Sequence, residues 1–378
     1  MLTKGLLANA VYRVAGRSFP FEDDYFQALN RARPLEKIVT MPVYEGAALK
    51  THARKVEDVG FLQFLGKFYE AALLLDALRG AGASNQFRAA LDIGSGPALQ
   101  PRIMKLVGRI EHLEAIDVYD GTRRCSDILL RRHARRLRRL YPLYRLQKLV
   151  PRPLRQHIGV LRKIDAKLPL GVEDFGHHPD ESPYGASFRR GPTLAAYHVG
   201  DVFAHQGRYD LVTSFMALEY FDFDKLALKV SELLEPGGYF GFLVSYWWYP
   251  VNSSLLYGRF PYLVQQLSGN EVMQYYGAVH PELPSEGLAR RLRYSDPGRP
   301  TIADYERIGY GHGLVPSRTL RLHPDHTRNS RAILGPLAID TLPGWTLETV
   351  LANTRRIKPD VQLSDLMTSH VLMLFRKR

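Results

Sequence analysis

The sequence predicts a doubly wound α/β fold, in which a mostly parallel sheet carries helices on both of its faces. Three observations predict it. An apolar run leads into a glycine turn at residues 89–98, and a second apolar run with an acid near its end follows at residues 110–119. Further strand-like blocks and a helix end then follow in order between residues 197 and 246. Strands that alternate with helices at this spacing favour βαβ units and a parallel sheet.

The glycine turn joins a buried strand, which ends at Asp92, to an amphipathic run that predicts a helix over residues 99–107. A turn without side chains lets a small ligand approach backbone N–H groups and the positive end of the helix dipole. Leu99 stands where the third glycine of the dinucleotide-binding pattern would fall, so that pattern is incomplete. The candidate binding residues of the turn are Asp92, Gly94, Ser95 and Gly96.

The second strand carries Asp117 near its carboxyl end, 25 residues after Asp92 (117 − 92). A carboxylate at this position can accept hydrogen bonds from two neighbouring ribose hydroxyls. The alternative is a solvated acid at a strand end. We favour the ribose contact because the glycine turn precedes it.

Three later blocks complete the pattern. Residues 197–203 are typical of a strand that ends at an acid, Asp201, which can accept an adenine amino proton. Residues 209–215 are typical of a buried strand that runs into residues 216–220. Residues 233–238 end a helix with Pro-Gly-Gly, since glycine supplies the left-handed cap and proline stops the helix, and a long apolar strand follows.

In this order, the blocks resemble the class I S-adenosylmethionine-dependent methyltransferases. Residues 92–98 look like that family's first motif, Asp117 looks like its ribose acid, and residues 200–202 look like its adenine-contacting segment. Residues 216–220 are similar to the Leu-Glu-His segment of quinone and small-molecule O-methyltransferases, with Tyr220 in place of the histidine.

The resemblance implies a seven-stranded, mostly parallel, Rossmann-like sheet and S-adenosylmethionine as the cofactor. Residues 234–238 match the helix end before the family's fifth strand, and residues 369–375 are similar to its last, antiparallel strand. The resemblance covers residues 86–123 and 191–246 well and the last ~35 residues loosely, and about half of the chain lies outside it. The cofactor-binding residues that it implies are Asp92, Gly94, Ser95, Gly96, Asp117, Asp201, Val202 and Phe215.

Composition predicts a folded protein in a reducing compartment. The 378 residues are 45% hydrophobic and 24% charged, a length beyond one doubly wound domain. Cys125 is the only cysteine, which excludes an intramolecular disulfide, and we expect a cytoplasmic protein. The first 21 residues carry three cations and no acid. A transit peptide is one interpretation, but we favour a packed amphipathic helix with apolar positions from Leu2 to Val11.

The excess positive charge lies in one segment, residues 123–167. The chain has 51 Lys and Arg against 38 Asp and Glu, a net charge of +13, and the segment alone has 15 against 2, also +13. It includes a predicted helix over residues 127–141, which Pro142 is expected to interrupt. Three interpretations stay open: a solvated helical excursion, a lid that supplies arginines to an anionic substrate, and a docking site for acidic lipid or RNA.

These patterns predict the domain organisation. The expected parts are an N-terminal helical lid region (1–85), an S-adenosylmethionine-binding core (86–246) interrupted by a basic helical insert (124–190), an aromatic-rich substrate cap (247–340), and C-terminal strands that complete the sheet (341–378). The clearest helix of the first part spans residues 61–78. For the aromatic-rich part, a small satellite core is an equal alternative to an acceptor pocket.

Glu219, just after the fourth strand, is our candidate for the catalytic base or the group that orients the acceptor. The alternative is a structural glutamate that caps the next helix or pairs with a lysine. His198, residues 177–178 and His312 have no partner at metal-ligand spacing, so we expect no metal site. No Asn-Pro-Pro-Tyr-like segment follows the fourth strand, and Cys125 lies after the second, which disfavours base amino groups and pyrimidine C5 as acceptors.

The predicted function is therefore methyl transfer from S-adenosylmethionine to O or N of a small molecule, aromatic or anionic, by direct displacement. We expect no nucleic-acid partner, while peripheral contact with a membrane and the oligomeric state stay open. One alternative is an RNA methyltransferase or a membrane-associated lipid or quinone methyltransferase that uses the basic insert. Another is a relative of the same fold that binds the cofactor without catalysis.

Overall fold

The computed structural model describes residues 11–14, 17–20, 60–84, 86–122, 125–149, 154, 157–159, 188–248, 262, 264–268, 270–271, 300–322 and 346–378. The chain divides into two compact units. The sheet unit consists of Arg54–Val244, Tyr305–Leu320 and Val371–Arg378. The second unit consists of Met1–Ala53, Ser245–Asp304 and Arg321–His370.

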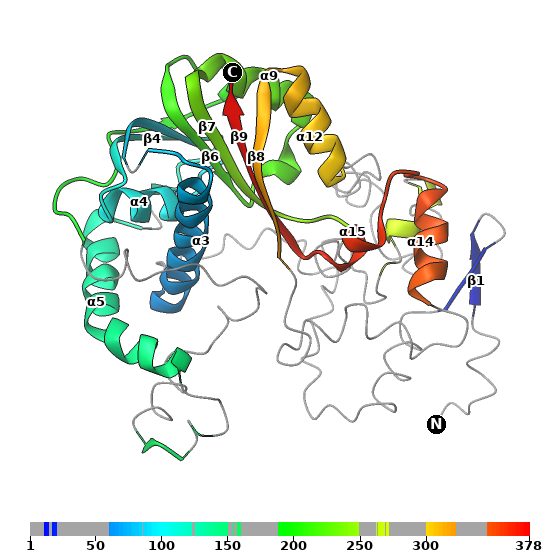
Figure 1. Ribbon diagram of the computed structural model, residues 1–378, viewed down its shortest axis with the longest axis horizontal. Helices are drawn as coiled ribbons and strands as arrows, with labels where there is room; N and C mark the ends of the chain where they lie inside the picture. Colours follow the sequence, from blue (N-terminus) through cyan, green and yellow to red (C-terminus); the bar gives the residue numbers. More distant parts are fainter. Residues whose placement is uncertain are drawn as a thin grey trace. The chain divides into compact units, whose positions relative to one another are not determined.

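Seven strands form one sheet in the order β5-β4-β3-β6-β7-β9-β8 (Figure 1). They are β3 (Phe87–Ile93), β4 (Ile110–Asp117), β5 (Ala196–Val199), β6 (Tyr209–Phe215), β7 (Leu234–Ser245), β8 (Leu314–Leu322) and β9 (His370–Lys377). The pairs β4–β5, β3–β4, β3–β6 and β6–β7 are parallel. Hydrogen bonds from Ser369 N to Leu322 O (2.9 Å) and from Arg378 N to Gly313 O (3.1 Å) join opposite ends of β8 and β9, which therefore run antiparallel.

The strand order reverses at β3. The chain passes from β3 to β4 and β5 on one side of the sheet, and from β6 to β7 on the other. In such doubly wound sheets, ligands bind outside the carboxyl ends of the strands at the point of reversal. The predicted fold class is confirmed, and the carboxyl ends of β3 and β6 are the place to look for a site.

Alternating residues of β7 show that helices cover both faces of the sheet. The helices are α3 (Phe61–Gly80), α4 (Leu99–Leu106), α5 (Asp127–Leu149), α9 (Phe223–Leu233) and α12 (Ile302–Gly311). A Cβ added to Gly241 would lie 2.7 Å from Leu74 of α3. The ring of Phe242, the next residue, lies 5.8 Å from that of Phe223 in α9 and 5.4 Å from that of Tyr305 in α12. Because neighbouring strand residues point to opposite faces, α3 covers one face and α9 and α12 the other (Figure 1).

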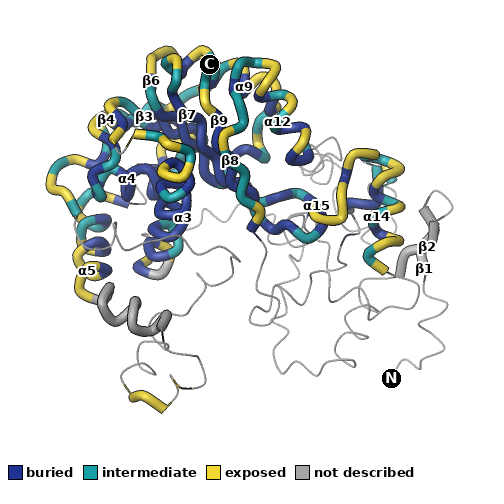
Figure 2. The backbone as a smooth tube through the Cα atoms, in the orientation of Figure 1, coloured by how far each residue is buried: buried dark blue, intermediate teal, exposed yellow. Residues whose placement is uncertain are grey.

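Two helices predicted from the sequence are confirmed. Helix α3 covers residues 61–78 and ends at Gly80, and it is buried on more than one side, with Phe64, Ala71, Leu74 and Ala77 all at most 1% exposed (Figure 2). Helix α4 begins at Leu99, as expected from the glycine turn before it. A helix that is apolar on most sides is typical of a buried element.

Three predictions differ from the structure. Val11 lies in a hairpin of β1 (Val11–Val14) and β2 (Arg17–Pro20), not in a helix. Helix α5 continues through Pro142 to Leu149, because a proline removes one backbone hydrogen bond without always ending a helix. Helix α12 and strand β8 lie within residues 247–340. Part of the expected substrate cap is therefore a strand of the sheet and a helix that covers it. The edge strand β8, which is mostly half-buried and contains Pro316, has too weak an apolar pattern to predict.

The second unit has a small core of its own around Tyr246, Trp248 and Tyr262, which are at most 1% exposed. The hydroxyl of Tyr246 donates to Asp365 Oδ1 (3.0 Å) and accepts from the backbone N–H of Ile302 (3.0 Å). These described aromatic residues pack in a small core, as the satellite-core interpretation expects. The other aromatic residues behind the pocket interpretation lie outside the described residues: Tyr249, Tyr257, Phe260, Tyr275 and Tyr276. This unit also contains η6 (Val264–Gln266), α14 (Leu347–Arg355) and α15 (Leu363–Met367).

Candidate functional site

The turn between β3 and α4 leaves room for a ligand at one of its two glycines. Both have a left-handed φ, +65° at Gly94 and +48° at Gly96. A Cβ added to Gly94 would lie 2.5 Å from the Cβ of Ala217, which follows β6, so the turn packs closely there. A Cβ added to Gly96 would meet no atom of the described residues within 4 Å. Gly96 is therefore the point where a ligand can approach the backbone.

Asp117, the last residue of β4, lies directly beside this turn. Its Oδ2 accepts a 2.7 Å hydrogen bond from the N–H of Gly96, and its Oδ1 accepts one of 3.1 Å from the N–H of Tyr119. Each carboxylate oxygen has a second lone pair, and the residue is only half-buried, so the carboxylate keeps acceptor capacity for a ligand.

Tyr197, in β5, joins the turn to the loop after β4. Its hydroxyl lies 2.8 Å from the carbonyl oxygen of Gly96 and 2.9 Å from that of Tyr119, and it accepts from the N–H of Gly121 (3.1 Å). Burial raises the pKa of Tyr197 to about 12, so the hydroxyl keeps its proton. Sequence reasoning missed this residue, because a tyrosine in a short strand carries no signal of its own.

Asp92 has a different environment from the other predicted site residues. Its side chain is 2% exposed and Oδ1 accepts a 2.7 Å hydrogen bond from the hydroxyl of Thr213 in β6. Burial raises the pKa of Asp92 to about 7, although the hydrogen bonds from Thr213 and Ser95 act in the opposite direction. In this structure the carboxyl group joins β3 to β6, and Ser95 Oγ donates to the backbone oxygen of Asp92 at 2.6 Å. Whether Asp92 also contacts a ligand stays a prediction.

Asp201 and Val202 follow β5 and form the start of a single 3₁₀ turn, η3 (Val202–Ala204). Asp201 is exposed and caps this turn by accepting from the N–H of Phe203 at 3.0 Å. Val202 is 4% exposed, so it is the buried residue of this turn. The structure therefore holds the predicted adenine-side residues in one ordered turn at the carboxyl edge of the sheet.

Backbone strain gathers at the same edge. Two residues other than glycine have a left-handed φ there: Ala98, the N-cap of α4, at +50°, and Met216, directly after β6, at +57°. Such a conformation costs on the order of 1 kcal/mol and is concentrated at functional sites. Phe215 ends β6 and is 8% exposed, while Glu219 is half-buried in the 3₁₀ turn η4 (Leu218–Tyr220).

Exposed apolar side chains also lie at this edge. Five of them lie at the carboxyl ends of β4, β5 and β6 or in the turns that follow these strands: Val118, Tyr119, Val199, Phe203 and Tyr220. The rings of Phe203 and Phe221 meet edge to face with centroids 6.4 Å apart. Because β4 and β3 lie between β5 and β6, this contact passes across the ends of two strands. Exposed apolar side chains beside ordered polar groups are typical of a small-molecule site.

Arg102 of α4 supports the turn from the protein interior. Its side chain is 3% exposed and donates to Pro97 O (3.2 Å), Cys125 O (2.6 Å), Thr193 Oγ1 (2.8 Å) and Asp127 Oδ1 (2.9 Å). These bonds fix the start of the basic helix α5. Desolvation alone would raise the pKa of Asp127, but the hydrogen bonds from Thr193 and Arg102 outweigh it and hold that pKa below its usual value.

Helix α5 presents arginines to solvent along its described part. Leu130, Ala134 and Leu137 are at most 2% exposed and form its packed side. Within residues 127–139 of this helix, the exposed arginines are Arg132, Arg135, Arg136, Arg138 and Arg139. Figure 2 shows exposed stretches along this part of α5. The guanidinium of Arg136 lies 4.3 Å from the ring centroid of Phe61, so this arginine has a structural contact.

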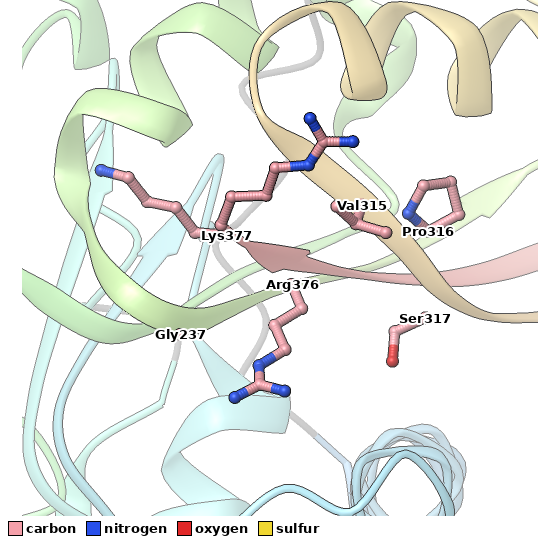
Figure 3. Close-up of a pocket in the computed structure, with 7 residues that line it drawn as sticks. Gly237, Val315, Pro316, Ser317, Arg376 and Lys377 are labelled. Atoms are coloured by element: carbon pink, nitrogen blue, oxygen red, sulfur yellow. The ribbon is translucent and has the colours of Figure 1, made fainter.

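A cavity of about 430 Å³ opens at the other end of the sheet (Figure 3). Its lining residues are Gly237, Val315, Pro316, Ser317, Arg376, Lys377 and Arg378. Figure 3 shows Arg376 and Lys377 on opposite sides of β9. Lys377 Nζ donates to Leu234 O (2.7 Å), and the guanidinium of Arg378 lies 4.2 Å from the ring centroid of Tyr310. Two of its three cations thus have structural partners, and it lies at the amino ends of the parallel strands, away from the switch point.

No protein-family model matches the chain, and a comparison with curated proteins finds no match. A comparison with solved structures finds distant likenesses at low sequence identity. One is geranyl diphosphate C-methyltransferase from Streptomyces coelicolor in complex with Mg²⁺, geranyl-S-thiolodiphosphate and S-adenosyl-L-homocysteine, at 13% identity and a TM-score of 0.37, over 82% of this chain and 75% of the other. Another is an S-adenosylmethionine-dependent methyltransferase from Mesorhizobium loti, at 12% identity and a TM-score of 0.35, over 80% and 96%. Likenesses of this size say nothing of this chain's activity or substrate.

No helix in the described ranges is long and apolar enough to cross a membrane.

Proposed function

We propose that this protein transfers a methyl group from S-adenosylmethionine to O or N of a small-molecule acceptor, in the cytoplasm. The observation that carries the proposal is the glycine turn at the point where the strand order reverses, with an open approach at Gly96 and the Asp117 carboxylate held beside it. The single cysteine supports the reducing compartment.

The residues present fit the cofactor. The open side of Gly96 is a cradle that any side chain would fill, and Asp117 has acceptor capacity for ribose hydroxyls. Asp201 and Val202 lie in the turn after β5, which would hold the adenine. When bound, S-adenosylmethionine supplies an electrophilic methyl group on a sulfonium.

The chain's own contribution is orientation and proton handling. An in-line displacement depends mainly on holding the acceptor lone pair in position. Glu219 follows β6, next to the strained Met216, where a carboxylate can accept a proton from an O–H or N–H acceptor or orient it. The exposed apolar side chains at this edge favour an acceptor with an apolar or ring-containing part.

The test is calorimetric titration of S-adenosylmethionine into the parent protein and two variants. Asp117→Ala removes the ribose acceptor. Asp210→Ala is the matched control, because Asp210 also accepts two backbone N–H bonds, from Arg88 (2.8 Å) and Ala89 (2.9 Å), at the other end of β3. We expect a loss of well over tenfold in affinity, about 1.4 kcal/mol or more, only in Asp117→Ala.

Parent protein that shows no saturable binding would refute the proposal. Binding without methyl transfer to any acceptor in a panel of phenols, amines and carboxylates would favour the non-catalytic alternative instead.

A further inference from the structure

A cluster of histidine and carboxylate side chains lies between β4, β5 and the turn that follows β5. Glu114 lies on β4 and His198 on the neighbouring strand β5, where it pairs with Ile116. His205 caps the end of η3, with its backbone N–H donating to Val202 O at 3.1 Å. Three regular elements therefore fix the backbone positions of the three side chains.

The three side chains converge. Glu114 Oε2 lies 2.8 Å from His198 Nε2, and the ring centroids of His198 and His205 are 4.8 Å apart. One ligand atom from each of the three residues lies within 4.8 Å of the other two. A tetrahedral zinc site with bonds of about 2.0–2.1 Å needs separations of about 3.3 Å between ligand atoms. Small side-chain rotations would suffice to reach that geometry.

A second layer of hydrogen bonds orients these side chains. The hydroxyl of Tyr209 donates to Glu114 Oε2 (2.9 Å) and lies 2.8 Å from His205 Nε2. His112 Nε2 lies 3.0 Å from the other carboxylate oxygen, Oε1. Outer groups that hold a carboxylate and an imidazole in place are typical of metal sites, where they fix ring orientation and ligand basicity.

We propose that Glu114, His198 and His205 form a binding site for a divalent transition-metal ion of the zinc class. Two imidazoles and one carboxylate are a common ligand set for zinc, with a water molecule in the fourth position. This proposal departs from the sequence analysis, which expected no metal site, because the three residues are spread over two strands and the turn after β5.

The ion would clamp residues 199–204, since His198 and His205 stand at the two ends of that segment. Asp201 and Val202 lie within it, so the site would hold the adenine side of the cofactor pocket in place. This consequence rests on the proposed function, whereas metal binding itself does not.

The experiment is a zinc titration of untagged, chelator-stripped protein in competition with a chromophoric chelator. The ligand variants are His205→Ala and Glu114→Gln. The matched control is His312→Ala, because His312 also pairs with a carboxylate, Asp224 Oδ1, at 2.9 Å in the same unit. We expect one ion per parent chain, and about 100-fold or more weaker binding in both ligand variants, with the control unchanged.

Two further measurements separate the site from a simple hydrogen-bonded cluster. Co²⁺ in the parent should give the intense visible absorption of tetrahedral coordination, and zinc should slow hydrogen exchange in residues 199–204. Parent protein that binds zinc no more tightly than His205→Ala, or an octahedral Co²⁺ spectrum, would overturn the proposal. Circular dichroism of each variant shows that the fold is intact. Neither readout uses S-adenosylmethionine, so the metal site and the proposed function can fail separately.

Discussion

The backbone N–H of Gly96 donates a 2.7 Å hydrogen bond to Oδ2 of Asp117, 21 residues further along the chain. The glycine turn after β3 and the acid that ends β4 therefore form one unit rather than two separate contacts. Tyr197 extends it, because its hydroxyl lies 2.8 Å from the carbonyl oxygen of the same glycine. A substitution at Asp117 consequently alters the turn as well as the proposed ribose contact.

The first prediction uses Gly96→Ala. The added methyl group meets no described atom within 4 Å, so it enters the space that a ligand needs. The left-handed φ of +48° costs on the order of 1 kcal/mol in stability for a residue with a Cβ. We expect S-adenosylmethionine affinity, measured by calorimetry, to fall by well over tenfold.

The control for this substitution is Gly82→Ala. Gly82 has a similar φ of +73° and equally open surroundings among the described residues, but it lies in the turn after α3. Both variants should lose similar thermal stability, and only Gly96→Ala should lose affinity. Gly94 is a poorer probe, because its Cβ would meet Ala217 at 2.5 Å and disturb the turn itself. Equal affinities in the two alanine variants would remove Gly96 from the binding site.

The second prediction concerns Asp92, whose burial raises its pKa to about 7 from the usual 3.8. Between these two values the unfolded chain has lost the proton and the folded chain retains it. This residue's contribution to the free energy of unfolding therefore falls as pH rises from about 4 to about 7, and is constant above. The full effect is at most roughly 4 kcal/mol.

Asp92→Asn removes this dependence, because the amide does not ionise and its oxygen can still accept from Thr213. We expect the variant to be more stable than the parent in urea denaturation at pH 8 and no more stable at pH 4. A difference between the two proteins that stays the same at both pH values would show that Asp92 does not titrate in this window.

The sequence predicted the parts of the fold that depend on local patterns. Apolar runs and the glycine turn at residues 94–96 predicted β3, α4, β6 and β7, because their signals come from neighbouring residues. The Pro-Gly-Gly of residues 236–238 was expected to end a helix, but α9 ends at Leu233 and these residues lie within β7. Strand β8 was missed, since its apolar and polar residues alternate weakly and it contains Pro316. The hairpin at Val11 was missed because a few apolar residues at mixed spacing fit a helix equally well.

The site was predictable at the carboxyl edge of the sheet but not in its cross-strand contacts. Gly96 and Asp117 could be chosen as candidates from their places after the first strand and at the end of the second. Tyr197 and the cluster of Glu114, His198 and His205 depend on strand pairing, which brings residues 84 positions apart to 2.8 Å. A histidine search by sequence spacing cannot find side chains that the register of β4 and β5 brings together.

The third prediction concerns the basic helix α5. A variant with Arg132, Arg135, Arg138 and Arg139 all changed to alanine removes exposed charges and spares Arg131 and Arg136. Those two are kept because the Arg131 guanidinium lies 3.7 Å from Asp127 and Arg136 lies over Phe61. We expect weak RNA binding by parent and variant alike at ~150 mM salt, where screening acts over about 8 Å.

Fluorescence anisotropy with labelled tRNA and rRNA fragments over a salt series measures this. Tight, saturable binding at ~150 mM salt that the variant with four substitutions abolishes would favour RNA over a small molecule as the methyl acceptor. The slope of log affinity against log salt concentration would then give the number of phosphates that the protein neutralises.

The last prediction concerns Glu219, half-buried in η4 after the strained Met216. If its carboxylate accepts a proton from the acceptor or orients it, Glu219→Gln keeps the shape of the side chain and removes the base. We expect unchanged S-adenosylmethionine affinity and turnover lower by ~100-fold or more, the usual contribution of a positioned base.

Glu235→Gln is the control, because Glu235 is also half-buried but lies at the amino end of β7. The measurement is the turnover rate at saturating acceptor for both variants. An acceptor that already carries an ionised carboxylate or a free amine needs no base, and Glu219 would then act through position alone. A Glu219→Gln rate within about threefold of the parent would exclude the residue from the mechanism and leave orientation as the main source of catalysis.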